Sequence, residues 1–428
     1  MFKFFSSTTP HNPMLGAKEI LKYIGPGFLV TVGFIDPGNW ASNVAAGAGY
    51  GYTLLWMVTL STLMLIVLQH NAAHLGIATG LCLSEAAAKH LPAWASRPLL
   101  GSAVLAAVST ALAELLGASI GLHMLFPALP IPLLTVLVTG VCLWLVLGNT
   151  YRKLEKYIIA FVGLIGLSFV FELFLVDISW GQAAVGWVTP AMPSGSLPII
   201  MSVLGAVVMP HNLFLHSEII QSRQWNLEDD EVIHRQLQFE FADTLAAMIV
   251  GWAINSAMIL IAAATFHTHG QPVNDIAQAQ QMLVPLLGNA AAVVFAFALV
   301  CAGLSSSVTA GMAGGSIYAG IFGESYDIKD VDTRMGVAIT LVGAALIVLV
   351  ISVFSGNFFA GLIISQILLS LQLPWTIFMQ IWLTSSKKVM GAHANSRLDR
   401  ILLWGAGIVV ATLNVLLLAS IARDWVGN

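Results

Sequence analysis

Two short sequences, each set inside an apolar stretch, decide the fold of this chain. Asp36-Pro37-Gly38-Asn39 interrupts the apolar run that begins at Phe28, and Met209-Pro210-His211-Asn212 interrupts the run that begins at Ile199. Proline removes a backbone hydrogen-bond donor and pushes the residue before it out of the α region, so both sequences predict an unwound helix. At membrane depth such a break is tolerated where protein or a water-filled cavity satisfies the backbone.

The remainder of the chain has the composition of a protein that lies in lipid. Of its 428 residues, 58% are hydrophobic and 9% are charged, whereas about 25% are charged in an average soluble domain. The mean hydropathy is +0.87. Apolar runs of roughly 20 residues, the length that crosses a bilayer, recur along the chain. We predict eleven transmembrane helices, near 24–44, 53–77, 99–124, 131–148, 157–176, 197–220, 239–265, 287–312, 336–354, 359–382 and 401–421.

The distribution of lysine and arginine predicts the orientation of these helices. If the N-terminus is cytoplasmic, all but one of the 17 basic residues fall in the tail or the loops on the cytoplasmic side, and the exception is Arg423. This asymmetry follows the positive-inside rule. The first twenty residues lack the apolar core of a cleavable signal peptide. We therefore expect a multi-pass protein of a plasma (inner) membrane, with its N-terminus cytoplasmic and its C-terminus outside.

The two breaks lie five predicted spans apart and divide the chain into two repeats. Because five is an odd number, the second repeat is inverted relative to the first, and interrupted helices at matching places indicate a secondary-transporter site. The prediction is an all-α polytopic fold with helices 1 and 6 unwound at mid-membrane. Its parts are a cytoplasmic tail (1–22), a first five-helix repeat (23–180), an inverted second repeat (181–385), and a cytoplasmic loop plus helix 11 (386–428).

The side chains at the breaks suit a metal cation. A carboxylate at the centre of a span costs at least ~2.5–3.5 kcal/mol, so Asp36 indicates a function rather than a simple proline kink. Asn39 adds an amide oxygen, the break frees backbone carbonyls such as that of Ala206, and Met209 adds a thioether. Thioether sulfur suits softer ions than magnesium or calcium, although a methionine taken alone more often fills a core. The set predicts a divalent ion such as Mn²⁺, Fe²⁺, Co²⁺ or Cd²⁺.

On these residues the sequence resembles the Nramp family, the natural resistance-associated macrophage proteins, which are proton-coupled importers of divalent metal. The four-residue sequences at the two breaks look like the two hallmark motifs of the family. Further stretches are similar, namely Gly76-Ile77-Ala78-Thr79-Gly80, Ala113-Glu114-Leu115-Leu116-Gly117, and Gly303-Leu304-Ser305-Ser306-Ser307 leading to Gly311-Met312-Ala313-Gly314. The resemblance implies the inverted 5+5 repeat of leucine-transporter-type symporters with one additional helix.

The resemblance also implies a set of metal ligands. By it, Asp36, Asn39, Met209 and the Ala206 carbonyl bind the metal. Gln366, in the tenth span, matches a position expected to approach the metal in the closed state, although a hydrogen bond between helices is an equally simple interpretation. Magnesium-transporting relatives lack the methionine, so Met209 favours a transition metal as substrate.

A proton pathway is implied as well, through Asp36, Glu114 and His211, with Arg334 as a basic partner at the start of the ninth span. Imidazole titrates near neutral pH when unperturbed, which suits His211 to this role. The chain departs from the family pattern at Ala111, where many members carry an aspartate, and it has one basic residue where the family places two. Proton symport and a metal uniporter without tight proton coupling therefore both remain open.

Other classes of protein fit the sequence less well. An organic-substrate symporter of the same fold also unwinds its first helix, but it needs no central carboxylate beside a thioether. An enzyme would need more than an Asp36 and His211 pair, and the chain has neither a His-Glu-x-x-His helix nor a Gly-rich phosphate loop. We expect no enzymatic activity, no resident cofactor and no nucleic-acid partner. The expected partners are the lipid bilayer, a divalent metal ion and H⁺, and the protein is expected to act as a monomer.

Overall fold

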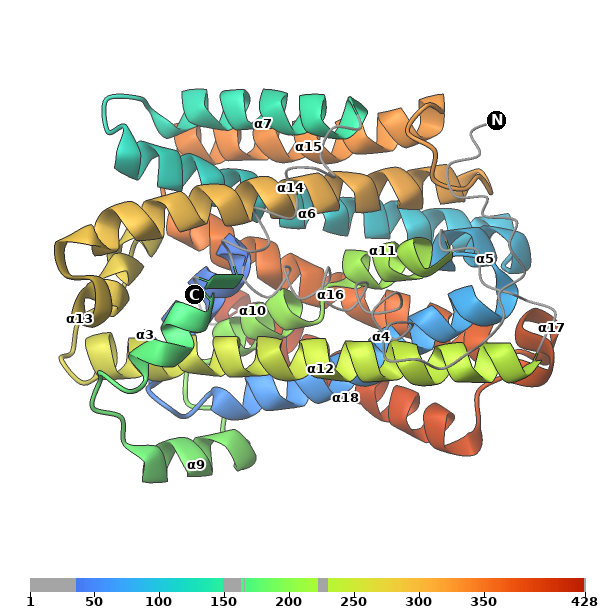
Figure 1. The fold of residues 1–428 in the computed structure, drawn as a ribbon, viewed down its shortest axis with the longest axis horizontal. Helices are drawn as coiled ribbons and strands as arrows, with labels where there is room; N and C mark the ends of the chain where they lie inside the picture. Colours follow the sequence, from blue (N-terminus) through green and yellow to red (C-terminus); the bar gives the residue numbers. More distant parts are fainter. Residues whose placement is uncertain (1–35, 149–162, 165, 222–229, 427–428) are drawn as a thin grey trace.

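The computed structural model describes residues 36–148, 163–164, 166–221 and 230–426, and within them every regular element is a helix (Figure 1). The first part of the described chain contains the helices α3 (Pro37–Tyr50), α4 (Leu55–Thr79), α5 (Leu83–His90), α6 (Ala93–Leu125) and α7 (Ile131–Leu147). Residues 163–164 and 166–172 are also helical and belong to the predicted fifth span. Residues 24–35 of the predicted first span lie outside the described residues.

The second part begins with a short helix, α9 (Trp180–Val188), and then contains the second interrupted span, α10 (Leu197–Val207) and α11 (Pro210–Gln221). The long helix α12 (Asp230–Ala262) continues into a π-helical turn, Ala263–His267. Short helical turns cover Ile276–Leu283, α13 (Val284–Leu287) and Gly288–Ala290. The remaining elements are α14 (Ala291–Ile321), α15 (Val331–Phe354), α16 (Phe358–Ser385), α17 (Lys387–Met390), the turn Gly391–His393, and α18 (Arg397–Val426).

Most predicted spans coincide with helices that are suited to a membrane. Within the described residues, eight helical segments are long and apolar enough to cross a bilayer, and α10 with α11 counts as one of them. Helix α7 is apolar but shorter, with 17 residues. Because the first and fifth spans are described in part, the total of eleven stays a prediction.

Several helices extend beyond the predicted spans. Helix α12 begins at Asp230 rather than near 239, and α6 begins at Ala93 rather than near 99. Hydropathy detects the segment that faces lipid, whereas backbone hydrogen bonding continues into the polar region beyond it.

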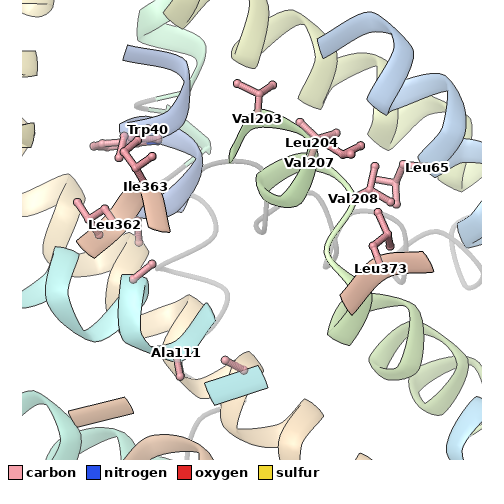
Figure 2. Close-up of a cluster of buried hydrophobic side chains, with 14 of the residues drawn as sticks. Trp40, Leu65, Ala111, Val203, Leu204, Val207, Val208, Leu362, Ile363 and Leu373 are labelled. Carbon is pink, nitrogen blue, oxygen red and sulfur yellow. The ribbon is translucent and has the colours of Figure 1, made fainter. Parts of the chain in front are cut away.

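The helices form layers around the second interrupted span (Figure 1). Helices α7 and α15 lie along one edge, α6 and α14 lie next to them, and α12 lies toward the opposite side with α4 and α18. Helices α10, α11 and α16 lie between these layers. Figure 2 shows part of the apolar core that α3, α4, α10 and α16 share, in which Trp40 lies near Ile363 and Val208 lies near Leu65 and Leu373.

Close approach between α6 and α14 depends on a residue without a side chain. A Cβ atom at Gly303 would meet the backbone oxygen of Glu114 at 2.5 Å and the backbone nitrogen of Ala118 at 2.7 Å. Small residues of this kind let transmembrane helices approach backbone to backbone. The small-residue stretch around Gly303, which the sequence singled out, therefore sets how closely α14 packs against the helix that carries Glu114.

We expect Gly303→Ala to destabilise the protein, because the added methyl group would overlap backbone atoms that cannot move aside cheaply. Overpacking of this kind costs about 1–3 kcal/mol. Thermal unfolding of the purified protein in detergent measures the change. Gly140→Ala on α7 is the matched control, because a Cβ at Gly140 meets no atom within 4 Å. Equal unfolding temperatures for the two variants would contradict the proposed contact.

Candidate functional site

The first break is organised by hydrogen bonds within its own four residues. Asp36 has extended backbone angles (φ −87°, ψ 160°) and caps α3, and Pro37 occupies the first position of that helix, where it is best tolerated. The Asp36 Oδ1 atom accepts a hydrogen bond from the Asn39 backbone N–H at 2.6 Å, and Oδ2 accepts one from Asn39 Nδ2 at 3.0 Å. The Asp36 carboxyl group is buried. The break thus holds a carboxyl group in a defined orientation inside the protein.

The second break separates α10 from α11 as predicted. Helix α10 ends at Val207 and α11 begins at Pro210, and Val208 has non-helical backbone angles (φ −101°, ψ 73°). In a continuous helix the N–H of residue 210 would bond the carbonyl of residue 206, but proline has no N–H. The Ala206 carbonyl is therefore free of its helical donor, as the sequence predicted.

Asn39 joins the two breaks directly. Its Nδ2 atom donates to Ala206 O at 2.9 Å as well as to Asp36 Oδ2. One turn further along α3, the hydroxyl groups of Ser42 and Ser202 lie 2.7 Å apart and connect α3 to α10 a second time. Three of the predicted metal ligands, Asp36, Asn39 and Ala206, therefore form one hydrogen-bonded group.

Helix α16 brings Gln366 against both breaks. Its side chain lies where a Cβ at Gly38 would be, and its backbone carbonyl lies where a Cβ at Gly205 would be. Gln366 is fully buried, and its Nε2 donates to Ser365 Oγ at 3.1 Å. Within the described part of the chain, Gln366 Oε1 has no hydrogen-bond partner. Gln366 therefore lies against both breaks, and its role at a metal stays a prediction.

Met209 lies at the break, but its sulfur is engaged within its own motif. The Asn212 Nδ2 atom donates to Met209 Sδ at 3.2 Å. The side chain is buried and packs with Ala106 of α6 and Leu369 of α16. Its role as a metal ligand stays a prediction, and in this structure the thioether also fills the core.

Two titratable residues predicted for proton transfer lie buried near the breaks. Glu114 on α6 lies three residues before Gly117, and a Cβ at Gly117 would overlap the Pro37 ring, so this face of α6 meets the first break. The carboxyl groups of Glu114 and Asp36 are close enough to interact electrostatically. His211 is buried in the first turn of α11. Among the described residues, neither Glu114 Oε2 nor His211 Nδ1 has a hydrogen-bond partner.

Ala111 lies in the core, whereas Arg334 lies at the protein surface. Ala111 is fully buried one turn before Glu114 on α6, in the apolar surroundings that Figure 2 shows. Arg334 is exposed in the first turn of α15, a helix that packs chiefly against α14, α6 and α7. The structure therefore does not bring Arg334 to Asp36, and its place in a proton pathway stays a prediction.

Some polar residues of the interior escaped the sequence analysis. Ser42, Ser202 and Glu240 are buried and bonded between helices, yet no motif or spacing marks them. A serine fits an apolar face as readily as a polar one. The carboxylate of Glu240, ten residues into α12, is the one signal that could have been used, because a buried charge needs a partner.

The grouped ligands suit a cation that binds and then leaves. Asp36 supplies one formal negative charge, and the other candidate ligands are neutral amide, carbonyl and thioether groups. Within the described residues, no group of three or more His, Cys, Asp or Glu side chains could hold a metal ion. Tight structural metal sites use several charged or imidazole ligands, whereas conduction of an ion requires binding weak enough for release.

Comparisons with known proteins agree with this chemistry. The sequence model of the family described as natural resistance-associated macrophage protein-like matches residues 27–420. The divalent metal cation transporter MntH of Granulibacter bethesdensis is 36% identical over 414 residues, which is 94% of this chain and 89% of that protein. The protein of the same name from Brucella suis is 36% identical over 413 residues, 94% of this chain and 88% of its own length.

Solved structures give the same result for the fold. A manganese transporter of Eremococcus coleocola is similar with a TM-score of 0.78 at 26% identity, over 98% of this chain and 91% of that chain. Mhp1, a nucleobase-cation symporter, is similar with a TM-score of 0.61 at 17% identity, over 92% of this chain and 91% of its own, a likeness of fold alone. The predicted all-α transporter fold class is confirmed. The relatives are transporters and not enzymes, which agrees with the expectation from the sequence.

We expect Gly38→Ala to weaken the binding of Mn²⁺ at this site, because the added methyl group would occupy the space of the Gln366 side chain and press on Asp36. A loss of about tenfold in affinity corresponds to about 1.4 kcal/mol. Isothermal titration of the detergent-solubilised protein measures the affinity. Gly49→Ala is the control, because it lies on the same helix and a Cβ there meets no atom within 4 Å. Unchanged affinity in Gly38→Ala would show that the contact does not shape the site.

Proposed function

The chain belongs to the natural resistance-associated macrophage protein-like (Nramp) family, and from this membership we propose that it imports Mn²⁺ or Fe²⁺ together with protons, by alternating access across a plasma membrane. Transport of divalent metal cations is the activity that its relatives carry in their names. The similarity to a solved manganese transporter supports Mn²⁺ as one of the ions.

One observation carries the proposal, which is the contact of Asn39 with both Asp36 and Ala206. Through it a charged oxygen ligand from the first break and a carbonyl ligand from the second lie within one hydrogen-bonded group. We infer that the ion binds among Asp36, Asn39, Ala206 and Met209, with Gln366 completing the site from α16. Because these ligands come from different helices, relative movement of the helices would change the coordination and release the ion.

The two buried carboxyl groups, Asp36 and Glu114, support the proposed proton coupling. A divalent ion at Asp36 favours the deprotonated form of that carboxyl, so metal binding releases a proton there. Glu114 is the neighbouring acceptor on α6, and a proton on one of the two groups relieves the repulsion between them. The membrane potential adds about 2.3 kcal/mol per charge per 100 mV to inward movement. Without a second acid at position 111, a metal uniporter is the competing proposal.

The orientation and surroundings of the protein belong to the same proposal. We propose a monomer in the lipid bilayer, with a cytoplasmic N-terminus, an external C-terminus and the 1–22, 23–180, 181–385 and 386–428 organisation expected from the sequence. The distribution of basic residues supports this orientation.

Met209→Ala tests the thioether. We expect this variant to transport Mn²⁺ but to lose discrimination against Ca²⁺ and Mg²⁺ by about tenfold, or about 1.4 kcal/mol, because soft sulfur disfavours those ions. Competition of each ion with Mn²⁺ uptake into proteoliposomes gives the selectivity. Met201→Ala is the control for the loss of a buried methionine, since Met201 is equally buried on α10 before the break. Unchanged selectivity in Met209→Ala would argue against a thioether ligand.

Uptake with a simultaneous pH measurement tests the coupling. We expect Mn²⁺ entry into proteoliposomes to acidify the lumen, and we expect Glu114→Ala and His211→Ala to reduce the proton flux more than the metal flux. Loss of a proton-transfer group typically costs a factor of about 10²–10⁴ in the transfer step. His123→Ala, which removes a histidine near the end of α6, is the control. Metal flux without proton flux in the unaltered protein would refute symport and leave metal transport intact.

A further inference from the structure

A second buried cluster of titratable side chains lies on α4, α11 and α12, apart from the breaks. Glu240 of α12 is its centre. The Glu240 Oε2 atom lies 2.5 Å from His70 Nδ1, and Oε1 lies 3.4 Å from His216 Nε2. Thr244, one turn further along α12, donates from Oγ1 to Glu240 Oε1 at 2.6 Å. One carboxyl group therefore connects two imidazole rings that come from two other helices.

The cluster leads from the interior toward the surface. The side chains of His216 and Glu240 are 1% and 4% exposed, whereas that of His70 is 31% exposed. His216 lies five residues after His211 on the same helix, a distance of about 7.5 Å along the axis. In the proposed orientation, the ends of α4 and α11 that follow His70 and His216 are cytoplasmic. The order His216, Glu240, His70 thus ends on the most exposed of the three side chains.

The atoms at each contact suit the transfer of a proton. An imidazole accepts a proton on one ring nitrogen and releases one from the other, and a carboxylate has two oxygens that act in the same way. His216 Nδ1 has no hydrogen-bond partner among the described residues, so this ring has a nitrogen available on the side away from Glu240. Within the described part of the chain, no group of three or more His, Cys, Asp or Glu side chains is arranged to hold a metal ion.

We propose that His216, Glu240 and His70 form a proton relay that delivers transported protons to the cytoplasmic surface. A proton enters at His216 Nδ1, and His216 passes its Nε2 proton to Glu240 Oε1. The proton between Oε2 and His70 Nδ1 moves onto the imidazole, which releases its Nε2 proton to water. One proton enters and one leaves, so no net charge remains in the interior. The inference rests on the proposed proton coupling.

Other rings and titratable groups surround the cluster. His74 stacks on His70 with ring centroids 6.5 Å apart, and the Phe241 ring meets His70 edge-on at 5.0 Å. Asp399 and His393 act electrostatically on His74. Helix α3, which packs against α12, contains no titratable side chain except Tyr50 at its far end. The remaining titratable or charged side chains on α11 and α12 within the described range include His211, Glu218, His234, Arg235 and Asp243.

Helix α6 does not extend the series of titratable side chains from Glu114 toward position 111. Ala111 occupies the position one turn before Glu114, so that face of α6 carries no second titratable group there. Helix α11 leads away from the second break and carries His216 toward Glu240. The cluster therefore provides titratable side chains on α11 and α12, whereas α6 has none at position 111.

The experiment measures the ratio of proton influx to Mn²⁺ influx in proteoliposomes that contain the full chain. We expect Glu240→Gln to keep Mn²⁺ influx and to lower the ratio by about tenfold or more, because the amide can form hydrogen bonds but cannot carry a proton. His70→Gln is the second variant and is expected to lower the ratio in the same way. Because both fluxes come from the same active molecules, the ratio does not depend on how much of a variant folds.

Glu218→Gln is the matched control. It removes a buried carboxyl group of α11 that accepts a hydrogen bond from Ser316 and lies outside the proposed relay. This variant should leave the ratio unchanged. Coupled influx in the unaltered protein with the same ratio in Glu240→Gln and His70→Gln would overturn the relay alone. Mn²⁺ influx without protons in the unaltered protein would overturn the proposed coupling and the relay with it.

Discussion

The hydrogen bonds of the Asn39 side chain are the constraint on which the rest of the structure depends. A buried carboxyl group and a carbonyl that has lost its helical donor are both costly in a membrane interior. The Asn39 Nδ2 group donates a hydrogen bond to both, to Asp36 Oδ2 at 3.0 Å and to Ala206 O at 2.9 Å. The same bonds hold the first break against the second, so the elements that would otherwise destabilise the interior become a defined site for a cation.

Residues without side chains let the other helices reach this site. The Pro37 ring occupies the space beside Gly117 of α6, the Gln366 side chain lies against Gly38, and the Gln366 backbone lies against Gly205 of α10. At each of these glycines, a neighbouring residue occupies the space that a Cβ atom would take. This lets α6 and α16 lie against the breaks. Close packing of this kind explains why glycines recur in the stretches that resemble the family motifs, since any side chain there would move a helix away from the breaks.

The buried titratable side chains of the interior form two separate groups. Asp36 and Glu114 form one at the breaks, and His216, Glu240 and His70 form the other on α11, α12 and α4. The first region contains the group that the metal ion would deprotonate, and the second has a side chain that reaches the surface. In the proposed mechanism, metal binding and proton release belong to different parts of the molecule, which α11 connects.

Local properties of the sequence determined the helices and the position of the second break. Hydropathy indicated the membrane-spanning helices, and the missing N–H of Pro210 predicted both the break and the free carbonyl of Ala206. Tertiary structure alone decided the contact of Gln366 with Gly38, the bond of the Met209 sulfur to Asn212, the exposed position of Arg334 and the partners of Glu240. A helix that is apolar on all sides does not reveal which face meets which neighbour, because hydropathy is then the same around its axis. Rotation and packing of the helices settle those contacts.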